Sequence, residues 1–544
     1  MKEEQPSADR LIFINGNLLT MDSANSVAEA IAIKDDKIEA IGKNGDIQQL
    51  ATEFSRVIDL EGKTMLPGFI EAHGHFPFSG FNAVGVNLNS PPIGTLTCLD
   101  DIITALKQQA EKTEKGKWVF GFGFDDTSIT EKQHLTRTLL DEISTDHPIC
   151  ITHISMHLAY ANSLGLSLSG ITEDTPDPVG GVICKDPESG KPNGVLEETA
   201  AMQLFYAVFG SFLEKIEDIV NWSVQDYASH GVTTVQCGVV SEMLMAVMQP
   251  QLTSESFPLR AIIWPDAEFS EKIIDGGFDV AALNSNRIQV GAAKLIGDGS
   301  IQAYTAHLTK PYHIPFKGNT AYRGYPVTDR ETMTQWVKKF HRAGMQIAIH
   351  GNGDATIDDI IYAVDQAQME FPREDTRHIA IHAQTTREDQ LDEMKRLGIT
   401  PSFFSAHAYY WGDRHCNIFL GKERAFRLNP AKSALDKGIP ITIHLDTPVT
   451  PINPLLLVWS AVNRLSAGGN IIGEKECITP TQALRAVTID AAWQVFQEHN
   501  RGSLEKGKYA DMVILSEDPQ KSRSAAKETE ILETIVGGKT VYKK

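Results

Sequence analysis

Apolar, strand-like runs that end in single metal-ligand residues recur along this chain, and they constrain its fold more than any other feature. The run at 66–75 ends in His73 and His75. Because strand side chains alternate between two faces, both imidazoles can reach one cation. Such a pair alone is weak, since two histidines near a loop are often polar surface. Four later runs, however, each end in one such residue: Lys294, His350, His382 and Asp446.

This series predicts an active site at the carboxyl ends of barrel strands, rather than unrelated core strands with polar ends. Eight apolar runs separated by helix-like segments also predict a parallel α/β architecture. Eight strands make a closed (β/α)8 TIM-type barrel, which is the predicted fold class. Lys294 would then lie on strand four, His350 on five, His382 on six and Asp446 on eight. The runs are 65–72, 233–237, 259–263, 288–294, 346–350, 378–382, 399–404 and 439–446.

The charge of the chain limits its partners. Its 544 residues carry 70 acidic and 50 basic side chains, a net charge of −20, whereas nucleic acids and anionic membranes require a basic surface. We therefore expect a small-molecule substrate and neither of those partners; the oligomeric state, monomer or homodimer, is left open. The polar segment 1–7 predicts no signal peptide, and six widely spaced cysteines fit reduced thiols in a cytoplasmic protein.

Six motifs carry a resemblance to a known family. They are PGFIEAHGH (67–75), KLIGDGS (294–300), IHGNGD (349–354), IHAQ (381–384), YWGDRH (410–415) and HLDTPVTP (444–451). In this order they resemble the amidohydrolase superfamily, and within it the amidohydrolase type 3 (YtcJ-like) group, which includes N-substituted formamide deformylases. The motifs span nearly the whole chain. The strand order of the ligand residues is also the order that the superfamily uses.

The resemblance also bears on domain organisation. Short strand-like runs lie at both chain ends, and an Asn15-Gly16 turn between runs 11–14 and 18–21 favours a hairpin. Either set of strands alone could be a separate β domain. The superfamily instead implies one β-sandwich from residues 1–62 plus 500–544, beside a barrel at 63–499.

The segment 76–221 is too long for a loop between two strands of the barrel. It contains its own apolar runs and helix-like segments. We expect it to form a subdomain inserted after the first barrel strand. On the carboxyl face of the barrel it would act as a lid or as a wall of the substrate pocket.

Imidazoles and carboxylates are the ligands that zinc-like ions prefer. The predicted ligands, more than one four-coordinate ion needs, are His73, His75, Lys294, His350, His382 and Asp446. We therefore expect one or two divalent ions, with zinc favoured. The resemblance implies that Lys294 is carboxylated and bridges two ions. Burial would favour the neutral amine that reacts with carbon dioxide. The alternative is an unmodified Lys294 held by Asp298 or a backbone carbonyl.

Catalytic roles are predicted for three residues. Asp446, touching both an ion and its water, would take the proton of the nucleophile and pass it to the leaving nitrogen. His157 would bind the substrate carbonyl oxygen, although a capping or solvated histidine is an equal alternative. His407 would line the site. His444 shares a face with Asp446 and would orient a ligand, and the segment 194–198 resembles a motif in which a carboxylate approaches the site.

The predicted function is metal-dependent hydrolysis of a non-peptide C–N bond, in an amide, N-acyl or N-formyl compound. Protonation of the leaving nitrogen favours this reaction, because an amide anion is a poor leaving group. A cyclic amide hydrolase, a deaminase or a lactonase would use the same scaffold. A non-catalytic regulator is the alternative from another class, and ligand residues at all six positions argue against it.

Overall fold

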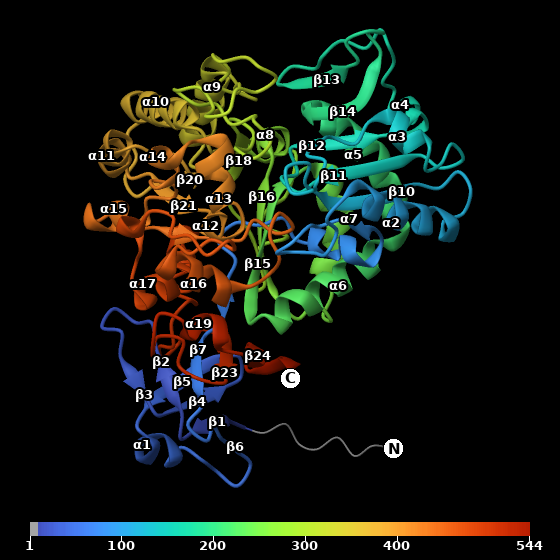
Figure 1. Cartoon of the computed structure of the whole chain (residues 1–544). Helices are drawn as coiled ribbons and strands as arrows, with labels where there is room; N and C mark the ends of the chain where they lie inside the picture. The colour runs from blue at the N-terminus through green and yellow to red at the C-terminus, as the bar shows by residue number, and fades with distance from the viewer. Residues whose placement is uncertain (1–8) are drawn as a thin grey trace.

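The computed structural model describes residues 9–544 (Figure 1). The segment on which the signal-peptide prediction rests lies outside this range. No helix within residues 9–544 is long and apolar enough to cross a membrane. All six cysteines are free, and Cys150, Cys184 and Cys237 are buried.

Two parallel sheets form the centre of the molecule. The first has the order β17-β16-β15-β8, and the second has the order β18-β19-β20-β21-β22. Both sheets contain consecutive strands in parallel register, as the sequence predicts for strands joined by helices. Their bounds are β8 (Phe69–Ile70), β15 (Val232–Val240), β16 (Arg260–Pro265), β17 (Ile288–Val290), β18 (Ala293–Ile296), β19 (Ile347–Gly351), β20 (Ile379–His382), β21 (Thr400–Phe403) and β22 (Thr442–Ile443).

Helices that follow these strands bury one apolar face against them. In α9 (Arg330–Arg342) the side chains of Met333, Val337 and Phe340 are buried, at a spacing that places them on one face of a helix. Asp329 caps this helix by accepting hydrogen bonds from two backbone N–H groups of its first turn. Helices α10 (Asp354–Glu370) and α11 (Glu388–Leu397) follow β19 and β20 in the same way.

The ends of the two sheets approach each other at β8 and β22. Just beyond these strands, the backbone N of Asp446 donates to the carbonyl of His73 (3.1 Å), and the N of His75 donates to that of Thr447 (2.8 Å). On the other side, only Gly291 and Ala292 separate β17 from β18. The hydrogen-bond ladders of these central strands form two sheets and, within residues 9–544, no continuous ring. The fold is α/β, and its parallel strands point their carboxyl ends to one face.

Strands from both ends of the chain pair with each other. One sheet has the order β5-β4-β1-β6 and the other the order β25-β24-β23-β7-β2-β3. Figure 1 shows the N-terminal strands beside β23 and β24. The bounds are β1 (Leu11–Ile14), β2 (Asn17–Leu19), β3 (Val27–Ala28), β4 (Ala30–Lys34), β5 (Lys37–Gly42), β6 (Arg56–Asp59), β7 (Thr64–Pro67), β23 (Met512–Leu515), β24 (Ile531–Val536) and β25 (Lys539–Lys543).

The prediction of a hairpin at Asn15-Gly16 is wrong. β1 pairs with β4 and β6, whereas β2 pairs with β3 and β7 in the other sheet. The turn, with Asn15 at φ +56°, therefore carries the chain from one sheet to the other. Phe13 and Leu18 on its two sides are buried in the same apolar cluster, and this packing outweighs the local preference for a hairpin.

The residues between β8 and β15 contain a third sheet, with the order β13-β14-β12-β11-β10-β9. Helix α5 (Thr199–Phe212) packs against β12, β13 and β14. This unit lies beside the central strands (Figure 1). The strands are β9 (Val86–Asn87), β10 (Val119–Phe124), β11 (Ile149–His153), β12 (Leu158–Ala161), β13 (Gly181–Lys185) and β14 (Pro192–Glu198).

Candidate active site

Asp446 lies at the centre of a cluster of the predicted ligand residues. Its Oδ1 is 3.2 Å from Nε2 of His75 and 3.4 Å from Nε2 of His73, and its Oδ2 is 3.9 Å from Nδ1 of His382. Lys294 Nζ is 3.2 Å from His73 Nε2, and His350 Nδ1 is 2.9 Å from His382 Nε2. The six side chains thus meet beyond the carboxyl ends of the parallel strands, although no two of them are close in sequence except His73 and His75.

Lys294 differs from the other five in its position on its strand. The run at 288–294 is interrupted after β17 by Gly291, and β18 runs from Ala293 to Ile296. Lys294 is therefore the second residue of β18 and not the last residue of a strand. Its register partner is Ala348, two residues before His350. Its long side chain reaches His73 from this deeper position.

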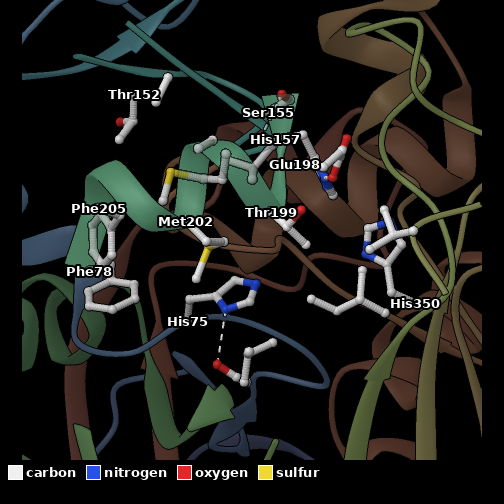
Figure 2. A pocket seen from close by; sticks show the side chains of 18 of the residues that line it. His75, Phe78, Thr152, Ser155, His157, Glu198, Thr199, Met202, Phe205 and His350 are labelled. Carbon is white, nitrogen blue, oxygen red and sulfur yellow. Dashed lines mark hydrogen bonds and ion pairs between the residues drawn. The ribbon is translucent and has the colours of Figure 1, made fainter. Parts of the chain in front are cut away.

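The first two histidines are oriented by oxygen acceptors on their far sides. His75 Nδ1 lies 3.1 Å from the carbonyl of Gly238, which can only accept, so this nitrogen carries the proton (Figure 2). His73 Nδ1 lies 3.1 Å from Oε1 of Gln236, whose orientation is fixed because the same oxygen accepts from the backbone N of Gly74. Both Nε2 atoms therefore point a lone pair toward Asp446, as metal-binding imidazoles do, and that of His73 also lies 3.2 Å from Lys294 Nζ.

This arrangement fits a divalent cation. Asp446 Oδ1 is buried and has no hydrogen-bond partner among residues 9–544, and two imidazole lone pairs face it across 3.2–3.4 Å. Three lone-pair atoms so placed repel one another unless a positive charge lies between them. Burial lowers the pKa of His73, His350 and His382 well below the ordinary value, so these rings are neutral, the form in which an imidazole can coordinate a cation.

Lys294 is buried among these groups. Burial lowers the pKa of its amine to about 7, which brings the neutral form within reach. The alternative partner Asp298 is occupied elsewhere, because it accepts from the backbone N–H groups of His307, Asn352 and Gly353. The hydrogen bond of Lys294 is to His73.

His444 occupies the supporting position that the sequence indicates. Its Nε2 is 3.0 Å from Nδ1 of His382, and its Nδ1 is 3.0 Å from Oγ of Ser402. Burial lowers the pKa of His444 to about 3, so the ring is neutral. Ser402 on β21 therefore orients His444, and His444 orients the ring of His382.

A cavity of about 170 Å³ opens beside the cluster (Figure 2). At one end it is lined by His75, Lys294, His350, His382 and Asp446. The opposite end is apolar, and Figure 2 shows Phe78 and Phe205 facing it with Met202 between the two ends. Helix α5 contributes Met202, Phe205 and Phe209 to the apolar wall, and α7 (Glu242–Leu252) contributes Met243 and Leu244. The segment 76–221 therefore contributes a pocket wall.

His157 lines the same cavity, close to the metal-ligand cluster. Its ring centroid is 4.9 Å from that of His350, and its Nδ1 is 2.7 Å from Oε2 of Glu198. Burial by itself lowers the pKa of His157, but the Glu198 carboxylate outweighs it, and the pKa is raised. His157 is thus an ion-pair partner inside the pocket and not a solvated helix cap.

His407 lies outside the cavity that His157 lines. Its Nδ1 is 3.0 Å from His415 Nε2, and its ring packs against Phe404 and Trp411, with centroids 4.3 and 4.5 Å away. It is buried and is not among the residues that line the described cavity. Its catalytic role stays a prediction.

A second cluster, Asp125, Asp126 and His153, also brings carboxylates and an imidazole together. The backbone N of Ser155 donates to His153 Nδ1 (3.2 Å), and His153 Nε2 faces Asp126 at 3.2 Å. Asp125 is bound by Arg414 at 2.6 Å. These pairings account for the charges of the cluster without a metal.

Sequence reasoning missed Gln236 and Gly238, which orient the two leading histidines. Both lie on β15, the second predicted strand, with Gln236 at its middle and Gly238 two residues further on. A glutamine within an otherwise apolar run was the signal that could have revealed the first. Gly238 acts through its carbonyl, which no side-chain pattern records. A Cβ at this position would lie 2.7 Å from the His73 ring, so the site requires glycine here.

The α/β fold and the His/Asp cluster at the strand ends define a hydrolase of the amidohydrolase type. The chain belongs to the amidohydrolase family, which matches residues 56–542. It is 29% identical to the N-substituted formamide deformylase of Arthrobacter pascens over 98% of both chains. It is 27% identical to the putative amidohydrolase YtcJ of Bacillus subtilis, over 98% of this chain and 100% of that protein. An uncharacterized metal-dependent hydrolase from Pyrococcus horikoshii shares its fold, with a TM-score of 0.75 and 24% identity over 94% of this chain and 99% of that one.

Proposed function

We propose that this protein is a metal-dependent hydrolase that cleaves the C–N bond of a small N-acyl or N-formyl compound. The observation that carries the proposal is the unpartnered Oδ1 of Asp446, faced by Nε2 of His73 and His75. We also propose that the two parallel sheets are one (β/α)8 barrel. The backbone hydrogen bonds from Asp446 to His73 and from His75 to Thr447, which join the ends of the sheets, support this. The free thiols support a cytoplasmic location.

The proposed metal ligands are His73, His75, His350, His382 and Asp446, with Lys294 between them. A divalent ion, with zinc favoured, would supply Lewis acidity toward the carbonyl and a lowered pKa of water. Lys294 would add its neutral amine to carbon dioxide, forming an N–C bond and releasing one proton. The resulting carbamate offers two oxygens, which would allow a pair of ions.

Asp446 would act as the base and then as the acid. Its carboxylate takes a proton from the attacking water as the new C–O bond forms, and gives it to the nitrogen as the C–N bond breaks. The product amine therefore leaves neutral, and Asp446 returns to its ionised form. His157, beside His350, would hydrogen-bond the polar group of the substrate during this exchange.

The apolar lining of the cavity favours a substrate that carries an apolar substituent. Phe78 and Phe205 line the end away from the proposed metal ligands, and Met202 and Phe209 also line the cavity. A charged group placed among these side chains would lose its hydration without a partner. A neutral amide or formamide with an aromatic or branched apolar substituent therefore fits best.

A hydrolysis screen tests the proposal. Metal-loaded protein is offered N-formyl and N-acetyl arylalkylamines, cyclic imides, lactones and aminopurines, and we expect turnover of the first two classes. Dialysis against a chelator should abolish turnover, and zinc, manganese or cobalt should restore some. Full activity of metal-free protein would refute the metal role, and a preference for cyclic imides, lactones or aminopurines would refute the substrate class.

A further inference from the structure

Glu198 stands at the junction between the inserted sheet and the pocket. It is the last residue of β14 and precedes α5. Its backbone has φ +53° and ψ −119°, a conformation that is strained for any residue except glycine. Strain of this kind persists where the surroundings impose it, and it concentrates at functional sites.

The two oxygens of the Glu198 carboxylate have different surroundings. Oε2 lies 2.7 Å from His157 Nδ1, and the backbone N of Glu198 donates to the carbonyl of His157 (2.8 Å). Oε1 is buried and has no hydrogen-bond partner among the described residues. A carboxylate kept only for stability would be satisfied on both oxygens, because an unpartnered buried oxygen is destabilising.

The Glu198 carboxylate lies close to Gly299, which is in the loop that follows β18. A Cβ on Gly299 would lie 2.0 Å from Glu198 Oε1, so the close approach exists only because the residue is glycine. The carbonyl of the same glycine lies 3.2 Å from His350 Nε2. Glu198 thus lies between the inserted sheet and a loop that touches a proposed metal ligand.

The preceding glutamate has a different role. Glu197 is also buried, but its Oε2 accepts from the hydroxyl of Tyr325 (3.0 Å) and its Oε1 from the thiol of Cys184 (3.2 Å). Neither contact reaches the cavity, and Glu197 does not line it. The sequence does not show which of these two adjacent glutamates has a role at the site, whereas the structure places Glu198 at the pocket.

We propose that Glu198 is a positioning residue that fixes the orientation of His157, with a proton on Nδ1, for contact with the substrate. A carboxylate can only accept, so the proton of the contact is on Nδ1 of His157. Nε2 of the ring makes no hydrogen bond with any residue of 9–544, and His157 lines the cavity beside His350. This nitrogen is therefore available to the polar group of the substrate.

The inference rests on the proposed function, since it assigns His157 to the substrate of that site. It adds a role for Glu198, whose backbone is strained: this residue orients His157 for contact with the substrate. It also predicts a specific energetic relation: the Glu198 side chain affects turnover only through His157. Removing it should therefore change nothing in a protein that lacks the imidazole.

A double-mutant cycle tests this relation. Glu198→Ala, His157→Ala and the double variant are compared with the wild type, as full-length zinc-loaded protein, on an N-formyl arylalkylamine that the wild type hydrolyses. We expect each single variant to lower kcat/KM by roughly 10- to 100-fold, the range for residues that orient a site. The double variant should equal His157→Ala. Glu197→Gln is the matched control and should stay within about twofold of the wild type, because the contacts of Glu197 with Tyr325 and Cys184 lie outside the cavity.

Two results would overturn the inference. One is wild-type kcat/KM in Glu198→Ala, and the other is a double variant whose loss is the product of the two single losses. Glu198→Gln, which keeps the volume and one acceptor oxygen, replaces the alanine variant if that variant does not fold, and should show a smaller loss of the same kind.

A measurement without turnover separates this inference from the proposed function. The Nδ1 proton of His157 should give a downfield proton resonance in the wild type that is absent in His157→Ala and is lost or shifted in Glu198→Ala. An unchanged resonance in Glu198→Ala would overturn the positioning role, whatever the substrate is. Absence of hydrolysis in the wild type across the whole screen would instead refute the proposed function.

Discussion

Replacing Asp446 by asparagine separates the role of a ligand from that of a base. The amide keeps the shape of the side chain and one oxygen donor, but it cannot take a proton from water. Asp446 Oδ1 has no hydrogen-bond partner among residues 9–544, so the substitution breaks no such bond there. The fold should therefore tolerate it, and the effect should appear in the chemical step.

The size of the effect follows from the absence of a substitute base. The imidazoles of His73 and His75 nearest to Asp446 point their lone pairs into the proposed metal site, and their Nδ1 atoms are engaged with oxygen acceptors. General acid–base catalysis contributes roughly 10²- to 10⁴-fold, so we expect kcat to fall by at least about 10²-fold. That corresponds to at least about 2.7 kcal/mol in activation free energy.

The assay is steady-state hydrolysis with metal content measured on the same samples. The loss should appear in kcat more than in KM, because the proton moves only on the way to the transition state. A weakened ligand would imitate this result, and the metal analysis distinguishes the two. Normal metal content with near-normal kcat would refute the reasoning, because it would show that Asp446 is a metal ligand and not the base. The base would then be sought at His157 or His407.

Three further outcomes are expected. Lys294→Ala should lose one ion and most turnover, with partial rescue by a short-chain carboxylic acid; metal analysis showing full occupancy with normal turnover would contradict the bridging role. Phe205→Ala should raise KM for substrates with bulky apolar substituents by roughly tenfold, since it removes a large apolar contact, while formamide itself should be unaffected. Burial holds the pKa of His378 at about 3, so the unfolded chain binds its proton at higher pH, near 6.5. The free energy of unfolding should therefore fall as the pH drops from about 6.5 towards 3, and denaturant titrations should show a weaker dependence for His378→Gln.

Alternation and order along the chain were sufficient to predict the α/β class and the candidate ligands. A strand end is a local property, visible as an apolar run followed by a polar residue, as at His350 on β19 and His382 on β20. The strands of the chain ends, such as β1 and β24, were visible for the same reason. Apolar runs of this kind are set by residues that are neighbours in sequence.

Tertiary structure decided which of these segments meet, and at what depth. The Asn15-Gly16 turn has the composition of a hairpin, yet it joins two sheets because Phe13 and Leu18 bury their side chains in a core completed by the other end of the chain. The choice of Glu198 over Glu197 depends on contacts with Gly299 and His157, 101 and 41 residues away. Local sequence sets the conformations that a segment can adopt, whereas the partners that satisfy its buried polar atoms come from distant parts of the chain.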